Sequence, residues 1–134
     1  MAERVLVDTS ALYALISSTD QFHHQAWLWY RALVSRREEL YITSYALVET
    51  IALVHRRLGF TQLRTFMESI QNVIRTYWVT PSVHAEAWDM LVARNSNQLS
   101  LVECSVIVVA RRLNAQVFAF DNDYRTEGLQ VIPR

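Results

Sequence analysis

Several residue types are scarce in this 134-residue sequence, and each scarcity excludes a class of protein. Only two glycines and two prolines occur, which excludes collagen-like and linker-rich chains and favours long regular elements joined by short loops. The single cysteine, Cys104, cannot form an internal disulfide, so a reducing cytoplasm is the expected location. No apolar run is long enough for a signal-peptide core or a membrane span, so we expect no membrane association.

Charge of one sign is also lacking, because 13 basic residues balance 13 acidic ones. The chain therefore has no global attraction for nucleic acid, and an anionic substrate would need a local basic patch. All the basic residues are arginine and none is lysine. Arginine suits bidentate contacts with phosphate, although genome composition produces the same bias.

Apolar residues are plentiful at 51%, and charged residues make up only 19% of the chain. This balance supports a real hydrophobic core and argues against disorder. The length fits one domain of ordinary size, and no repeat or change in composition divides the chain. We therefore predict a single domain over residues 1–134.

The hydrophobic patterns predict alternating strands and helices. Strands are expected at 4–7, 40–43, 76–79, 116–120 and 129–132. Helices are expected at 9–16, about 21–37, 44–58, 61 to about 72, 81 to about 95, and 100–113, with a loop at 95–98. This alternation is typical of parallel β-α-β units, so we predict an α/β fold: a three-layer α/β/α sandwich around a mainly parallel sheet of about five strands.

Four acidic residues occupy unusual positions. Asp8 and Asp121 each end an apolar strand, and the working sites of such sheets lie at the carboxyl ends of the strands. Glu49 and Glu103 lie inside strongly apolar helices, where an unpaired charge is costly. If these carboxylates converge, a hard divalent cation such as Mg²⁺ or Mn²⁺ relieves their repulsion.

Each of these residues also has a purely structural interpretation. Asp8 can cap the first helix, and Ser100 with Glu103 has the spacing of a capping box. Glu49 can face solvent or pair with an arginine two turns later, and Asp121 can simply begin a turn. Taken singly, none of the four residues is specific to a metal site, and only their joint placement indicates one.

The segments around these acids resemble the PIN domain, and most closely the toxin ribonucleases of VapBC toxin–antitoxin pairs. The similar segments are 5–12 (VLVDTSAL), 44–50 (SYALVET), 99–105 (LSLVECS) and 117–124 (VFAFDNDY). They follow the family's order over nearly the whole chain, and the first and last are the most specific.

The resemblance implies a metal-dependent endoribonuclease that hydrolyses RNA phosphodiester bonds. By position, the family's acidic site falls on Asp8, Glu49, Glu103 and Asp121. Of these, Asp8, Glu103 and Asp121 would bind Mg²⁺ or Mn²⁺, while Glu49 would be a ligand or orient the attacking water. Ser10 would support Asp8. Such toxins form homodimers and are neutralised by a small antitoxin protein.

Two positions depart from the family pattern. The third acid is usually aspartate and here is Glu103, and a residue that is often histidine is here Asp123. We expect Asp123, like Ser10, to support the ligands, although its extra carboxylate can also join the site or weaken the approach of a phosphate. Either departure can alter metal preference or lower activity.

Three other functions remain open at this stage. One is a catalytically weak interaction module with the same fold, and another is a housekeeping PIN nuclease of RNA processing. The third is a phosphatase of the haloacid dehalogenase kind, suggested by a strand followed by Asp121 and Asp123. Arg125 stands where that phosphatase family has threonine or valine, which argues against it.

Overall fold

The computed structural model describes residues 2–95 and 97–134. Its strands are β1 (Arg4–Val7), β2 (Glu39–Thr43), β3 (Ile74–Tyr77), β4 (Gln116–Phe118) and β5 (Val131–Ile132). Its helices are α1 (Thr9–Ile16), α2 (His23–Ser35), α3 (Ser44–Leu58), α4 (Phe60–Ile70), α5 (Pro81–Arg94), α6 (Leu101–Leu113) and α7 (Asp123–Thr126). The loop expected at 95–98 includes residue 96, which lies outside the described residues.

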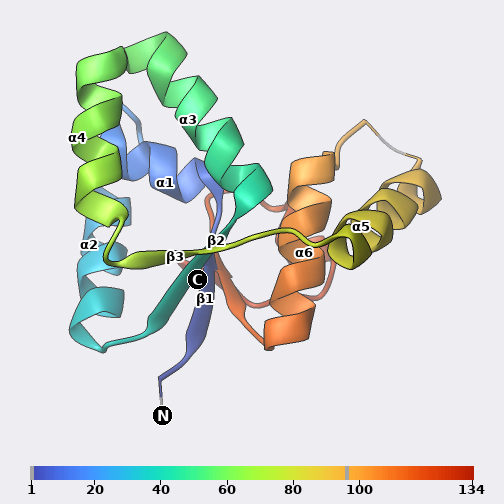
Figure 1. The fold of residues 1–134 in the computed structure, drawn as a ribbon. Helices are drawn as coiled ribbons and strands as arrows, with labels where there is room; N and C mark the ends of the chain where they lie inside the picture. The colour runs from blue at the N-terminus through green and yellow to red at the C-terminus, as the bar shows by residue number, and fades with distance from the viewer. Residues whose placement is uncertain (1, 96) are drawn as a thin grey trace.

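The five strands form one parallel sheet in the order β3-β2-β1-β4-β5. Helices α1 to α4 cover one face, and α5 and α6 cover the other (Figure 1). The predicted three-layer α/β/α sandwich with a parallel sheet is therefore confirmed. The strand order reverses at β1, which lies between β2 and β4.

The central strand and one helix are buried on all sides. Val5, Leu6 and Val7 of β1 have no exposed surface, as expected of a strand covered on both faces. In α6 every residue from position 104 to 110 is buried, because this helix lies between the sheet and α5. Cys104 begins that run and belongs to the core rather than to a reactive site.

The buried apolar residues form one continuous cluster that joins the sheet to the helices. In the part of the chain that the structure describes, no helix combines the length and the apolar character that a bilayer span requires.

Several predicted boundaries are reproduced because local signals decide them. Helix α3 ends at Leu58 because Gly59 adopts φ +89° and ψ 169°, a conformation that side chains disfavour. Helix α5 begins at Pro81 with the Thr80 hydroxyl capping its first turn.

Other boundaries differ where tertiary contacts decide them. Strand β3 begins and ends two residues earlier than predicted, because Tyr77 pairs with the last residue of β2 and Trp78 turns into solvent. Strand β4 ends at Phe118, and the chain then turns so that the Phe120 N–H donates to Ser10 Oγ. The four-residue helix α7 was not predicted, because four residues are too few to show a helical hydrophobic period.

Candidate active site

The candidate site lies at the carboxyl edge of the sheet, where the strand order reverses. Asp8 follows β1 directly, and Asp121 lies three residues after the end of its neighbour β4. The backbone N–H of Asp8 donates to the carbonyl of Phe118 over 2.9 Å, which holds the two strand ends side by side. Ligands of open α/β sheets bind at such a reversal point.

Both carboxylate oxygens of Asp8 are held by donors. Asp8 caps α1, and its Oδ2 accepts from the backbone N–H of Ser10 over 3.0 Å and from the Ser10 hydroxyl over 2.7 Å. Its Oδ1 accepts from the Tyr124 hydroxyl over 2.5 Å. Burial raises the pKa of Asp8, while the Tyr124 and Ser10 donors oppose that rise and the charge of nearby Asp121 adds to it. The capping interpretation of Asp8 is therefore confirmed, and its role as a metal ligand stays a prediction.

Ser10 supports Asp8 as predicted and also connects two parts of the chain. Its hydroxyl donates to Asp8 and accepts from the Phe120 N–H over 3.0 Å. The start of α1 is thereby tied to the segment that carries Asp121. This contact fixes the separation between the first and last acidic segments of the chain.

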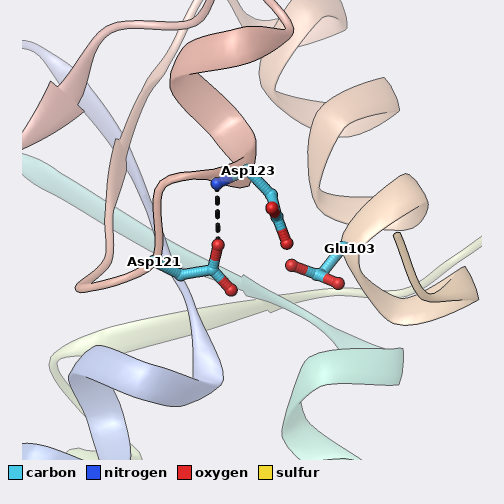
Figure 2. Close-up of side chains that lie close together, drawn as sticks. All are labelled: Glu103, Asp121 and Asp123. Atoms are coloured by element: carbon cyan, nitrogen blue, oxygen red, sulfur yellow. Dashed lines mark hydrogen bonds between the residues drawn. The ribbon is translucent and has the colours of Figure 1, made fainter. Parts of the chain in front are cut away.

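Three other carboxylates, those of Glu103, Asp121 and Asp123, gather in front of this edge (Figure 2). One oxygen from each lies within 4.8 Å of the others, and all three side chains are half-buried. Asp121 Oδ1 accepts from the backbone N–H of Asp123 over 2.8 Å, which shapes the turn into α7. The carboxylates of Glu103 and Asp123 point toward each other. We call Glu103, Asp121 and Asp123 the acidic triad.

Glu103 divides its two oxygens between two environments. Oε1 accepts from the Ser100 N–H over 3.0 Å, and the Ser100 hydroxyl accepts from the Glu103 N–H, so the predicted capping box is present. Oε2 is buried and has no hydrogen-bond partner among the described residues. Burial first, and then the neighbouring Asp121 and Asp123, raise the pKa of Glu103 to about 8, although the Ser100 N–H opposes the rise.

Asp123 lies in the acidic triad, where its carboxylate supplies one of the three oxygens. Of the alternatives that the sequence left open for Asp123, this position favours a carboxylate that joins the site. The signal available in the sequence was the spacing: residues 121 and 123 are separated by one residue, and an aspartate-led turn brings both side chains to one side.

Glu49 is not among the described acidic residues whose oxygens lie within 4.8 Å of one another. It is exposed on α3, four residues after Tyr45. Its predicted role as a ligand, or in orienting water, stays a prediction.

One arginine, Arg94, lies beside Asp123 of the triad and is paired with a carboxylate. Glu127, just after α7, accepts two hydrogen bonds from Arg94, of 2.9 and 2.6 Å, and lies 3.4 Å from an Arg111 nitrogen. A hollow of about 120 Å³ is lined by Arg94, Leu99, Asp123 and Glu127 together with Gln98 and Thr126. A guanidinium therefore reaches the rim of the acidic site, paired there with the Glu127 carboxylate.

Comparison with known protein families gives a match over most of the chain. A family model for the PIN domain matches residues 5–127, which include Asp8 and the whole acidic triad. The chain belongs to the PIN domain family.

This PIN domain protein is similar to a curated relative and to several solved structures. It is 29% identical over 127 residues to the 23S rRNA-specific endonuclease VapC20 of Mycobacterium tuberculosis, covering 92% of this chain and 94% of that one. The crystal structure of the M. tuberculosis VapC20 toxin, described as cleaving the sarcin-ricin loop, superposes with a TM-score of 0.82 at 28% identity over 93% of this chain and 95% of that one.

More distant structures share the fold alone. DNA-bound VapBC of Salmonella typhimurium superposes with a TM-score of 0.70 at 12% identity, covering 98% of this chain and 97% of the other. PAE2754 of Pyrobaculum aerophilum superposes with a TM-score of 0.66 at 23% identity, covering 98% and 85%.

Proposed function

We propose that the protein is a metal-dependent endoribonuclease that acts as the toxin of a toxin–antitoxin pair. The observation that carries this proposal is the acidic triad at the reversal point of a PIN-domain sheet, with Asp8 directly behind it. The likeness to VapC20 over nearly the full length of both chains supports the same activity.

The residues at the site fit a divalent cation. Carboxylate oxygens are the ligands that Mg²⁺ and Mn²⁺ prefer, and Oε2 of Glu103 is buried with no hydrogen-bond partner among the described residues. We propose that Asp8, Glu103 and Asp121 hold Mg²⁺ or Mn²⁺, and that Asp123 joins them as a ligand. When bound, the cation lowers the pKa of a coordinated water and stabilises charge on the phosphate oxygens.

The protein groups orient the reaction. Ser10 and the start of α1 hold the Asp8 carboxylate against rotation. The Ser100 cap sets Glu103 so that only Oε2 faces the site. Glu49, on α3, would orient the attacking water or add a ligand, as the resemblance implies.

The substrate proposed for this site is RNA. VapC20 is specific for 23S rRNA, so 23S rRNA is the first substrate to test. Arg94 is held by Glu127 at the rim, where a guanidinium can contact the RNA backbone. Backbone contacts of this kind supply affinity without reading the base sequence.

The partners that we propose are a small antitoxin and a second copy of the chain, both in the cytoplasm. Large apolar side chains are exposed outside the site, among them Trp27 and Leu28 on α2, Trp78, and Trp88 on α5. A hollow of about 310 Å³, lined by Leu15, Ile16, Trp27, Tyr30, Gln62, Thr65, Phe66, Ser69 and Ile70, lies between α1, α2 and α4. Such apolar surface is typical of protein-binding sites.

The test of the proposed function is cleavage of 23S rRNA by purified protein with and without Mg²⁺ or Mn²⁺. We expect cleavage that EDTA abolishes, and we expect Asp121→Asn to slow it on the order of 100-fold or more, because a metal contributes several kcal/mol and about 1.4 kcal/mol is a tenfold change in rate. Asp89→Asn is the matched control, since Asp89 is exposed on α5 and lies outside the triad.

Two results would contradict the proposal. One is metal-dependent cleavage by Asp121→Asn at the wild-type rate. The other is a failure of wild-type protein to bind Mn²⁺ at millimolar concentration in calorimetric titration, which would favour a PIN-fold interaction module instead.

A further inference from the structure

The Tyr124 hydroxyl has a contact that packing alone does not require. Tyr124 lies in α7, has no exposed surface, and donates to Asp8 Oδ1 over 2.5 Å. Its ring fills core volume that a phenylalanine ring would fill equally well. Only the hydroxyl of Tyr124 contacts the Asp8 carboxylate, so a tyrosine at this position has a role beyond filling the core.

Without Tyr124, one oxygen of Asp8 would lose its donor. Ser10 donates twice, and both bonds go to Oδ2. With Tyr124, both oxygens of the Asp8 carboxylate accept hydrogen bonds. A carboxylate that is bonded at both oxygens cannot turn about its Cβ–Cγ bond.

The neighbours of Tyr124 in the chain connect this hydrogen bonding to the acidic triad. Asp123, one residue earlier, turns its carboxylate toward Glu103, while Tyr124 turns into the core toward Asp8. The first turn of α7 thus positions the Asp123 carboxylate in the triad and, through Tyr124, orients the Asp8 carboxylate. A shift of this turn would move both together.

We propose that Tyr124 is a positioning residue that orients the Asp8 carboxylate toward the divalent cation held by the acidic triad. This inference rests on the proposed function, because it assumes that a cation binds there. In this proposal the Tyr124 hydroxyl acts on the metal site only through its hydrogen bond to Asp8 and is not itself a metal ligand. Partners that orient metal ligands in this way typically contribute about 10- to 100-fold to metal affinity.

The test is the Mn²⁺ affinity of Tyr124→Phe, measured by calorimetric titration. We expect affinity to fall about 10- to 100-fold relative to wild type. Tyr41→Phe is the matched control, because it removes another tyrosine hydroxyl that donates to a carboxylate, that of Glu39, on β2 outside the site. We expect Tyr41→Phe to bind Mn²⁺ as wild type does.

A double-mutant cycle separates positioning from packing. If Tyr124 acts through Asp8, adding Tyr124→Phe to an Asp8→Asn background should cause little further loss of Mn²⁺ affinity. Equal losses in both backgrounds would overturn the proposal, as would a Tyr124→Phe variant that is less stable to heat yet binds Mn²⁺ normally.

A measurement on the wild-type protein covers the case in which Tyr124→Phe does not fold. In NMR spectra of protein labelled with ¹³C-tyrosine, addition of Mg²⁺ should shift the Tyr124 ring signals, and the midpoint of this shift should match the midpoint of Mg²⁺ binding. Tyr124 signals that do not change when Mg²⁺ binds would overturn the proposal. The proposed function fails separately, when wild-type protein binds no metal at all.

Discussion

At the scale of single residues, Glu103 shows how one side chain serves both folding and chemistry. The usual aspartate of the family at this position is one methylene shorter. Here the longer side chain places Oε1 on the Ser100 N–H of its own helix and leaves Oε2 at the site. The alternatives that the sequence left open, cap or site residue, are therefore not exclusive.

Substitutions at the two ends of this cap should separate the roles. Ser100→Ala removes the capping hydroxyl and should lower the free energy of unfolding by about 1 kcal/mol, while Mn²⁺ affinity changes little. Glu103→Gln retains an acceptor for the Ser100 N–H, so stability should not fall, whereas Mn²⁺ affinity should. Urea unfolding and calorimetric titration measure the two effects. A Glu103→Gln variant with normal Mn²⁺ affinity would show that Glu103 is a cap only.

Protonation of Glu103 should couple metal binding to pH. Its pKa is raised to about 8 from an ordinary value of 4.5, so at pH 7 the folded protein holds a proton that the unfolded chain has lost. The contribution of Glu103 to stability should therefore decline as pH rises from about 4.5 to about 8, and Glu103→Gln should remove this decline. Urea unfolding at several pH values measures the effect.

The same proton must leave when a cation binds. Calorimetric titrations with Mn²⁺ at pH 7 in buffers of different ionisation enthalpy should show proton release, and the release should fade above pH 8. Equal proton release at pH 6.5 and pH 9 would contradict the raised pKa.

At the scale of elements, the sequence predicted those features that local chemistry decides. Asp8 as a cap, the stop at Gly59 and the start at Pro81 each rest on one or two adjacent residues. Helix α7 depends instead on Tyr124 reaching Asp8, a contact between residues 116 positions apart. Periodicity cannot reveal such a contact, which is why helix α7 was not predicted.

A substitution at Gly59 tests whether the backbone conformation of this one residue contributes to stability where α3 ends. Gly59→Ala forces a β-carbon into a conformation suited to glycine, although no heavy atom lies within 4 Å of the added carbon. We expect the free energy of unfolding to fall by about 1–3 kcal/mol through backbone strain alone. Mn²⁺ affinity should not change, because Gly59 lies at the end of α3 remote from the sheet edge where α3 begins. Unaltered stability in urea unfolding would contradict this account.

At the scale of the whole molecule, cation binding should stabilise the fold as well as the site. The acidic triad and Asp8 come from β1, α6 and the β4–α7 segment, so a bound cation would join parts of the chain that are distant in sequence. Mn²⁺ at 100 times its Kd should add about 2.7 kcal/mol to the free energy of unfolding. Thermal unfolding should show a Tm rise of several degrees that EDTA reverses. The same rise in Asp121→Asn would contradict the proposed ligands.

The central place of β1 has a consequence for synthesis on the ribosome. This strand emerges first, yet its neighbour β4 lies more than 100 positions later in the chain, and so do Asp121 and Tyr124. In a nascent chain, Asp8 and the residues of the acidic triad therefore remain apart until residues 116–124 have left the exit tunnel. Any nuclease activity is consequently withheld from the translating ribosome until almost all of the described chain has been made.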